Sequence, residues 1–444
     1  MNIDILEKKL TSFQIIIIGF LSVIVAGALL LTLPVSSASG HWTSVEEALF
    51  TSTSAVCVTG LVVRDTASYW SAFGQFIIML LIQIGGLGII SVTAFIATVA
   101  GRKISLLQRS MLQDSISAHH IGGIVKMTSF IFKVSFLTEA AGALMMLPSF
   151  CSRFGTKGIW MAIFHSVSAF CNAGFDLMGN KSGAFSSLTA LSDDISIILP
   201  ISLLIVVGGI GFLTWEDLAV HKLDFKHYRM QSKVILTTTF MLITIPTAIF
   251  FFYDFSMLPL KQRLCLSLFQ AITPRTAGFN TFDLSLMSSA SRALIVVLML
   301  IGGSPGSTAG GMKTTTLGVL CANFMAIVRR KKSPQLFDRR IEDSTVKSAA
   351  TLMLMYIYLT LFGAFIISVF DNVPIETCIF ETASAIGTVG LSLGLTPGLS
   401  MFSHMILILL MFFGRVGGLT LLFAAVNSTG MEVARCPIEK INVG

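Results

Sequence analysis

The sequence predicts an all-α polytopic membrane protein with eight transmembrane helices, in which four parallel helix–pore-loop–helix repeats surround a central pore with pseudo-fourfold symmetry. Composition is the first observation: the 444 residues are 54% hydrophobic and only 12% charged, and the mean hydropathy is +0.84. This composition excludes a soluble globular protein. The second observation is a short segment that recurs along the chain at a nearly constant period, which indicates an internal repeat.

The recurring segment opens with an apolar residue and Phe, continues through small and hydroxyl residues, and closes on a tripeptide that ends in Gly. Its copies are residues 49–61, 163–175, 268–279 and 379–391. We call the closing tripeptides triplets; they are Val58-Thr59-Gly60, Asn172-Ala173-Gly174, Thr276-Ala277-Gly278 and Thr388-Val389-Gly390. Consecutive triplet glycines are 114, 104 and 112 residues apart. This spacing defines units 1 to 4, which cover residues 1–101, 102–222, 223–332 and 333–444.

Two apolar runs flank each copy. A run of roughly 20 apolar residues is needed to cross a hydrocarbon core of about 30 Å. The paired runs are residues 13–33 and 73–100, 127–147 and 195–215, 234–252 and 293–328, and 347–370 and 401–427. Each unit therefore crosses the membrane twice and returns the chain to its starting side. Units of this kind share one orientation about an axis along the membrane normal, so they can close around a pore.

Lys and Arg are distributed unevenly between the two sides. The segments that we place inside carry 19 of the 30 basic residues, and the segments that contain the motif copies carry 8. Because positive charge stays on the cytoplasmic side, both termini are expected in the cytoplasm and the copies enter from outside. The cluster Arg329-Arg330-Lys331-Lys332 is interpreted first as an example of this rule. The second interpretation is a docking site for an acidic cytosolic partner or anionic membrane lipid. Membrane topology thus accounts for the net charge of +7, and nucleic-acid binding is not needed to explain it.

Each copy is predicted to re-enter the membrane and to place its triplet at membrane depth. Non-helical backbone at that depth must be buried in protein or line a water-filled cavity. Extended triplets would point carbonyls at an axis, where they replace the hydration shell of a cation, and the last Gly would supply backbone angles denied to other residues. The stretch before the triplet, such as residues 376–386, has the length of a short helix that aims partial negative charge at the ion. All triplet residues are therefore candidate ion ligands.

An alternative is that these Gly-containing segments are packing surfaces between transmembrane helices. Recurrence at a near-constant period, each time between two apolar runs, favours the filter. The copies are not identical, because Asn172 begins the triplet of unit 2 and the third copy is one residue shorter between its Phe and its Gly. We therefore expect one dominant ion site.

The second run of unit 3 is interrupted by residues 302–315, which hold five Gly and one Pro. A continuous helix there is disfavoured, because Gly costs about 1 kcal/mol and interior Pro about 3 kcal/mol relative to Ala. We predict a flexible gate below the triplets, with a structural kink as the alternative. The gate residues are Gly302, Gly303, Ser304, Pro305, Gly306, Ser307, Thr308, Ala309, Gly310, Gly311 and Lys313. Gly pairs at 85–86, 208–209 and 417–418 in the other units are expected to allow close helix packing.

Arg415 lies in an otherwise apolar run of unit 4. A charge near mid-membrane costs at least about 2.5 kcal/mol and is normally paired or directed at water. Arg415 is therefore predicted to belong to the gate, either through hydrogen bonds to loop carbonyls or as an electrostatic barrier to cations. An ion pair with Glu381 is the third alternative. Lys313 is expected to snorkel or to cap the loop.

With these residues in view, the chain resembles the Trk/Ktr/HKT superfamily of potassium transporters over nearly its whole length. Residues 273–280, TPRTAGFN, are the most specific match. Within the superfamily the chain is most similar to the Ktr-type bacterial membrane subunit, because its first run begins near residue 13 without an extra pair of preceding helices. The resemblance also supports the gate, since the corresponding segment is the intramembrane loop of that family.

The resemblance implies potassium uptake across a bacterial plasma membrane by a homodimer in which each chain has its own pore. It also implies a cytosolic ring of nucleotide-binding regulatory subunits. Sodium dependence stays open, and the alternatives are a sodium/potassium symporter or a less selective monovalent cation channel. A non-transporting receptor is the rival outside transport.

An enzyme is not expected. The seven His residues give only the adjacent pair His119-His120 and isolated cases, with no metalloprotease spacing. The seven Cys residues show no CxxC spacing and are interpreted as small hydrophobic side chains. No organic cofactor is expected, and the transported potassium ion is the expected ligand.

Overall fold

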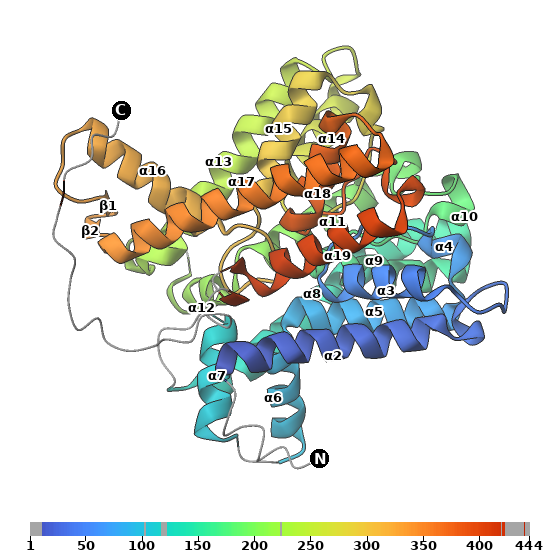
Figure 1. Cartoon of the computed structure of the whole chain (residues 1–444), viewed down its shortest axis with the longest axis horizontal. Helices are drawn as coiled ribbons and strands as arrows, with labels where there is room; N and C mark the ends of the chain where they lie inside the picture. The colour runs from blue at the N-terminus through green and yellow to red at the C-terminus, as the bar shows by residue number, and fades with distance from the viewer. Residues whose placement is uncertain are drawn as a thin grey trace.

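The computed structural model describes residues 11–101, 104–116, 122–222, 224–418, 420–421 and 439. It is a helical bundle in which each unit has a long first helix, a short pore helix, a triplet and a second helix (Figure 1). The predicted cytoplasmic termini lie outside the described residues, apart from residues 420–421 and 439 near the C-terminus. The pair His119-His120 also lies outside them.

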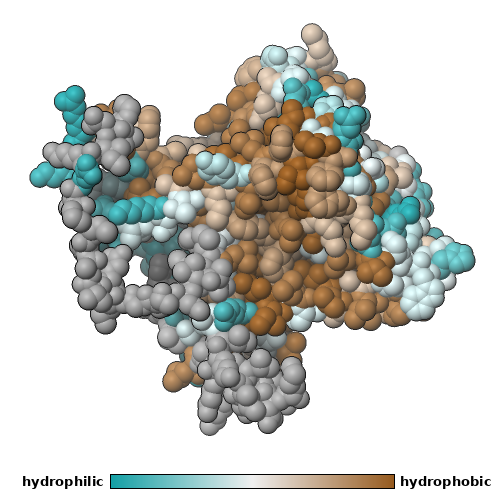
Figure 2. All heavy atoms as spheres, viewed as in Figure 1, coloured by the Kyte–Doolittle hydropathy of each residue, from teal (hydrophilic) through white to brown (hydrophobic). Residues whose placement is uncertain are grey.

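The first helices are long and mostly apolar around their whole circumference, as lipid-facing spans must be. They are α2 (Ser12–Thr32), α8 (Ile124–Phe154), α13 (Met230–Phe252) and α17 (Asp343–Asp371). On α17, for example, Phe362 and Phe365 are exposed. Figure 2 shows apolar side chains over the middle of the molecule and hydrophilic ones near its two ends. The hydrophilic ends lie around α4 (Thr66–Tyr69) and α10 (Gly179–Ser182) on one side, and around β1 (Gln335–Leu336) and β2 (Arg339–Arg340) on the other.

Each pore helix packs against the first helix of its own unit. The pore helices are α3 (Val45–Val56), α9 (Lys157–Phe170), α14 (Leu260–Ile272) and α18 (Ile375–Gly387). Their C-terminal halves are buried, and each ends immediately before or within a few residues of its triplet. The helix predicted over residues 376–386 is thus confirmed within a residue of each end.

The second helices are broken in more units than the sequence suggested. The pair α5 (Ala72–Leu87) and α6 (Ile89–Val99) bends by 96°, and the pair α11 (Ile195–Gly209) and α12 (Phe212–His221) bends by 97°. Gly88 and Gly211 stand at the bends with φ of 84° and 91°, a backbone region that favours glycine. The expectation that residues 73–100 and 195–215 are single runs is therefore wrong, because these glycines release the helix.

In unit 3 the break is longer, as predicted: residues 301–313 separate α15 (Ser289–Leu300) from α16 (Thr314–Val328). In unit 4, α19 (Met401–Val416) ends at Gly417. Four described helices are long and apolar enough to cross a membrane alone, and the two bent pairs raise this number to six. The predicted count of eight spans therefore stays a prediction for the shorter helices of units 3 and 4.

The Gly pairs have the expected packing role, and in unit 4 a Cβ atom on Gly418 would lie 2.0 Å from Met355 Cε of α17. A Cβ atom on Gly85 would lie 2.0 Å from Val56 O, one on Gly208 2.0 Å from Phe170 O, and one on Gly414 2.1 Å from Ile386 O. Each of these carbonyls belongs to the residue two positions before a triplet. Gly414, not Gly417 or Gly418, is thus the counterpart of Gly85, and it brings α19 into backbone contact with its pore helix.

The remaining elements are short or peripheral. They are α7 (Leu106–Ile116), the 3-10 turns at Pro34–Ser36, Thr189–Leu191, Phe225–His227, Leu284–Leu286 and Thr396–Gly398, and the antiparallel strands β1 (Gln335–Leu336) and β2 (Arg339–Arg340). The register of the two strands pairs Gln335 with Arg340 and Leu336 with Arg339.

Replacing Gly414 by Ala tests the backbone contact between α19 and α18. The new methyl group would overlap Ile386 O, so we expect a loss of about 1–3 kcal/mol in the free energy of unfolding, which is typical of overpacking. Gly122→Ala is the control, because a Cβ atom there meets nothing within 4 Å. The thermal unfolding midpoints of the purified proteins measure the difference. Equal midpoints would contradict the contact.

Candidate functional site

The four triplets meet in a closed ring. A Cβ atom on Gly60 would lie 2.4 Å from Ala173 O, and one on Gly174 would lie 2.8 Å from Ala277 O. The corresponding distances are 2.2 Å from Gly278 to Val389 O and 2.2 Å from Gly390 to Thr59 O. Each triplet glycine thus contacts the middle carbonyl of the next triplet, and the last contact returns to the first unit. The structure therefore brings together all four segments that the sequence singled out.

The triplet backbones are not extended strands, which corrects our expectation. The first residue of each triplet is left-handed, with φ of 57° at Val58, 58° at Asn172, 64° at Thr276 and 51° at Thr388. The triplet glycines also have positive φ, between 70° and 91°, as expected, whereas the middle residues do not. The triplets therefore lack the regular extended backbone of a β-strand.

A hydroxyl side chain anchors each triplet, and our sequence reasoning did not assign it this role. Ser54 Oγ accepts from the N–H of Gly60 and Ser384 Oγ from that of Gly390, both at 3.0 Å. In the other two units the hydroxyl donates instead, to the carbonyl that follows the triplet. Ser168 bonds Phe175 O and Thr273 bonds Phe279 O, both at 2.7 Å. The missed signal is a hydroxyl residue four positions after the Phe of every copy.

The same four residues also bind the triplets through their backbone. The middle N–H of each triplet donates to the carbonyl of the hydroxyl residue in its unit. The bonds are Thr59 N to Ser54 O at 2.8 Å, Ala173 N to Ser168 O at 2.7 Å, Ala277 N to Thr273 O at 3.0 Å and Val389 N to Ser384 O at 2.8 Å. Because N–H groups are used in this way, the triplet carbonyls are the backbone groups left for a ligand.

Side chains make the ring unequal. The amide of Asn172 lies 3.2 Å from Thr276 Oγ1, and the amide orientation that satisfies both groups lets Thr276 donate to Asn172 Oδ1. Units 2 and 3 are therefore joined by side chains as well as by backbone. In units 1 and 4, by contrast, the hydroxyls of Thr59 and Thr388 are buried without a hydrogen-bond partner in the described part of the chain.

The interrupted segment of unit 3 lies directly against the ring. A Cβ atom on Gly310 would be 2.2 Å from Thr388 Oγ1, and one on Gly311 2.8 Å from Gly387 O. The segment is an ordered turn, because Gly302 N donates to Met312 O at 2.7 Å and Ser307 Oγ donates to Ser304 O at 2.6 Å. We call residues 302–313 the loop.

The broken helix of unit 2 holds the loop by its free backbone groups. Carbonyls in the last turn of a helix have no partner within the helix. Ser304 N donates to Gly209 O at 3.0 Å and Thr308 N to Gly208 O at 3.3 Å, while Phe212 N donates to Gly306 O at 2.6 Å. Unit 4 contributes a similar bond, from Gly311 N to Gly414 O at 3.2 Å. The free backbone groups at these helix ends and those of the loop thus form hydrogen bonds with each other.

Arg415 joins the loop to unit 1. Its Nη1 donates to Thr308 O, and its Nη2 donates to Gly85 O and, at 3.0 Å, to Gly86 O. Gly85 and Gly86 lie in the last turn of α5, just before the bend at Gly88. One guanidinium on α19 thus bridges units 1 and 3, which is the geometry of the first alternative proposed for this residue.

The other charged candidates are placed as follows. Lys313 Nζ donates to Ala309 O at 2.9 Å, so it caps the loop from within. Glu381 is fully buried and accepts from Ser392 Oγ at 2.5 Å and from Thr396 Oγ1 at 2.8 Å. The third alternative, an ion pair between Arg415 and Glu381, is therefore wrong, because Glu381 holds the segment that follows its own triplet.

Cavities lie on both sides of this assembly. One of about 330 Å³ is bordered by the loop, α2, α7 and α19, with Met312, Lys313 and Arg415 in its wall. Another of about 580 Å³ is lined by residues that follow the triplets of units 3 and 4, including Asn280, Ser392 and Gly394. The first cavity thus touches the loop and Arg415, and the second lies beside the segments that follow two of the triplets.

Re-entrant segments that meet in a ring within a bundle of apolar helices define a membrane transport protein. The chain belongs to the TrkH family, described as cation transport proteins, whose sequence profile matches residues 6–432. The family consists of transporters, which confirms both the resemblance to Trk and Ktr proteins and the expectation that the chain is not an enzyme.

Relatives match over almost their whole length. The chain is 40% identical to the potassium/sodium uptake protein NtpJ of Enterococcus hirae, over 99% of this chain and 98% of that protein. It is 36% identical to the Ktr system potassium uptake protein B of Bacillus subtilis, over 94% and 93%. The crystal structure of the potassium transporter TrkH from Vibrio parahaemolyticus is similar with a TM-score of 0.73 and 19% identity, covering 94% of this chain and 85% of that one. This last likeness shows a shared fold.

Replacing Ser384 by Ala tests the hydroxyl anchors. The N–H of Gly390 loses its acceptor in a partly buried setting, which costs up to about 1–3 kcal/mol. Ser384→Thr keeps the hydroxyl and serves as the matched control. The thermal unfolding midpoint of each purified variant is the measurement, and we expect a lower midpoint for the alanine variant alone. An unchanged midpoint in both would show that the anchor does not stabilise the ring.

Proposed function

We propose that this protein takes up potassium ions across the plasma membrane of a bacterium, through a gated, channel-like pore on the axis of the four triplets. The observation that carries the proposal is the closed ring of triplet contacts, from Gly60 through Gly390 and back to Thr59. A ring of backbone carbonyls is the arrangement that replaces the hydration shell of a monovalent cation. Relatives whose names describe potassium uptake support this choice of ion.

The proposed filter works through preorganisation. The hydroxyl anchors and the left-handed first residues hold the carbonyls in place before an ion arrives. Four pore helices end at the triplets and contribute the negative ends of their dipoles. Asn172 and Thr276 are joined on one side of the ring only, which supports one dominant site rather than a row of equal ones.

The proposed gate is the loop, residues 302–313, with Arg415. The loop lies between the ring and the cavity lined by Met312 and Lys313, where it would obstruct an ion that has passed the triplets. Bonds from units 2 and 4 hold it there, and Arg415 also bonds to Gly85 of unit 1. Since the loop has no helical hydrogen bonds of its own to lose, its displacement breaks a small, defined set of contacts.

The assembly and coupling follow the Ktr-type relatives. We propose a homodimer with one pore per chain, in contact with membrane lipid, and a cytosolic ring of nucleotide-binding subunits that regulates it. The Ktr system relative supports a regulatory partner. The name of the Enterococcus hirae relative, potassium/sodium uptake protein, favours a second candidate, which is a sodium/potassium symporter or a less selective cation channel.

Uptake of radioactive rubidium, a potassium substitute, tests the function. Expression in a potassium-starved bacterial host that lacks its own uptake systems should accelerate rubidium entry, and external potassium should compete with it. Sodium present or absent during uptake separates the symporter from the channel-like pore. Rubidium entry equal to that of the empty host would overturn the proposal.

Replacing Arg415 by Gln tests the gate. The variant loses charge-assisted hydrogen bonds worth about 1.5–3 kcal/mol each, so the closed state should be disfavoured by about tenfold or more. Basal rubidium flux into liposomes without regulatory subunits should rise accordingly.

Arg415→Lys separates the two roles of Arg415. It keeps the charge but lacks the fork that reaches three carbonyls. Raised flux in both variants supports a tether, and raised flux in the Gln variant alone supports an electrostatic barrier. Unchanged flux in both would remove Arg415 from the gate.

A further inference from the structure

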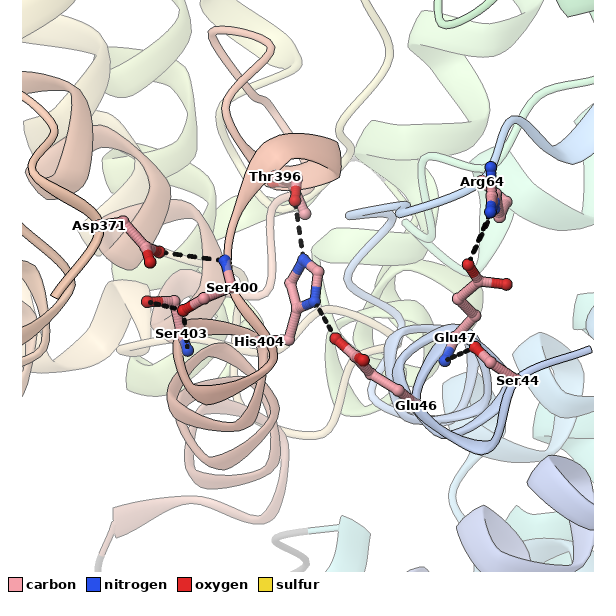
Figure 3. Close-up of polar contacts among 9 residues, drawn as sticks. All are labelled: Ser44, Glu46, Glu47, Arg64, Asp371, Thr396, Ser400, Ser403 and His404. Atoms are coloured by element: carbon pink, nitrogen blue, oxygen red, sulfur yellow. Dashed lines mark hydrogen bonds and ion pairs between the residues drawn. The ribbon is translucent and has the colours of Figure 1, made fainter.

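Glu46 and His404 join the first and last units beside the ring. Glu46 lies in the first turn of the pore helix α3, and His404 lies in the first turn of α19 (Figure 3). Their atoms Oε1 and Nδ1 are 2.6 Å apart although the residues are 358 positions apart in the chain. The Gly390–Thr59 contact closes the ring between the same two units. The pair therefore lies on the seam that the folding chain must close over its longest separation.

The hydrogen-bond partners of His404 determine how many protons this contact holds. Nε2 of His404 is 2.8 Å from the carbonyl oxygen of Thr396, which only accepts, so Nε2 carries a hydrogen. Nδ1 faces the Glu46 carboxyl at hydrogen-bond distance, and this bond also requires one hydrogen. If this hydrogen is on Nδ1, His404 is an imidazolium and Glu46 a carboxylate. If it is on Glu46, that side chain is a carboxylic acid and His404 is a neutral imidazole. In both forms the closed pair holds one proton more than a separated neutral His and ionised Glu.

Several acidic side chains lie around His404. The groups that face it are Glu46 from α3, Asp371 at the end of α17, and Glu381 of α18, which binds the Thr396 hydroxyl. Glu47, one residue along α3, is paired with Arg64 at 2.8 Å and is therefore neutralised. Phe50 covers the ring face, with the two ring centroids 5.1 Å apart. No Lys or Arg of the described chain bonds this pair, so a proton is the cation available to it.

Water reaches one partner only. His404 is 3% exposed, whereas the side chain of Glu46 is 27% exposed. Glu46 can therefore turn into solvent when the shared proton is lost, while the imidazole stays buried against Thr396 and Phe50. Proton loss thus separates the two units at a defined place.

The contact is coupled to both parts of the candidate site. α3 carries Ser54, the anchor of the first triplet, and Thr396 is bonded to Glu381 on the pore helix of the fourth. α19 carries His404 near its start and Arg415 at its end, about 16 Å apart at 1.5 Å per residue. Separation of Glu46 from His404 can therefore alter the ring through α3 and Thr396. It can alter the loop through α19, which carries Arg415.

We propose that the Glu46–His404 pair is a proton-binding site on the outer face of the pore, and that its occupancy holds units 1 and 4 together and keeps the ring in its ion-binding form. This rests on the proposed function and orientation. Because closing takes up one proton, the ratio of closed to open pairs falls about tenfold for each pH unit wherever the open pair is a neutral His and an ionised Glu. Acidic solution stabilises the contact, and alkaline solution releases it.

The main experiment compares rubidium uptake in three proteins while the external pH is raised from about 5 to about 8, the range in which histidine changes charge. For the wild type, KM should rise with pH, with a limiting slope of about tenfold per unit, because only the closed form binds the ion well. Glu46→Gln should abolish the slope, since its amide donates to neutral Nδ1 and the contact needs no extra proton. Glu47→Gln is the matched control: it makes the same change in charge on the same helix, and it should keep the wild-type slope.

A second measurement keeps the test independent of transport. The thermal unfolding midpoint of the purified wild type should fall relative to that of Glu46→Gln as pH rises over the same range. If no protein transports rubidium, the proposed function fails while the midpoints still test the proton site. A flat wild-type profile, or a wild-type slope retained by Glu46→Gln, overturns the inference. If Glu46→Gln does not fold, His404→Gln replaces it, and the wild-type midpoint should likewise fall relative to that of His404→Gln as pH rises.

Discussion

Backbone carbonyls without helical partners are the constraint on which this structure depends. Every bend in a second helix leaves such groups at membrane depth, where each unpaired one is costly. The loop of unit 3 supplies donors for Gly208 and Gly209, and the guanidinium of Arg415 supplies one for Gly86 and a second one for Gly85. The pore helices use their own last carbonyls to bind triplet N–H groups. The triplet carbonyls accept no hydrogen bond from the described residues, and that is where the proposed ion would bind.

Much of the architecture could be predicted because it depends on local sequence. The period of the four copies located the triplets and the pore helices, and the density of Gly and Pro in residues 302–315 located the break in unit 3. Arg415 could be linked to that break because a charge in an apolar span needs a partner. Each of these inferences used a signal contained in one stretch of chain.

The rest could not be predicted, because it depends on contacts between units. A Gly in an apolar run has the same appearance whether it packs, as Gly85 and Gly414 do, or bends the helix, as Gly88 and Gly211 do. The left-handed Val58 and Thr388 are imposed by the ring, since their residue types favour other conformations. The Glu46–His404 contact has no sequence signature, because it joins residues 358 positions apart.

In the described chain the loop occurs in one unit, although the ring that it contacts is built from all four. Units 2 and 4 bond to it, and Arg415 connects it to unit 1. If the loop is the gate proposed above, the rest of the bundle is a fixed frame for one moving part. A pore made of four identical chains would need four such parts to move together, so duplication and divergence within one polypeptide would permit a simpler transition with one barrier and no requirement for concerted motion.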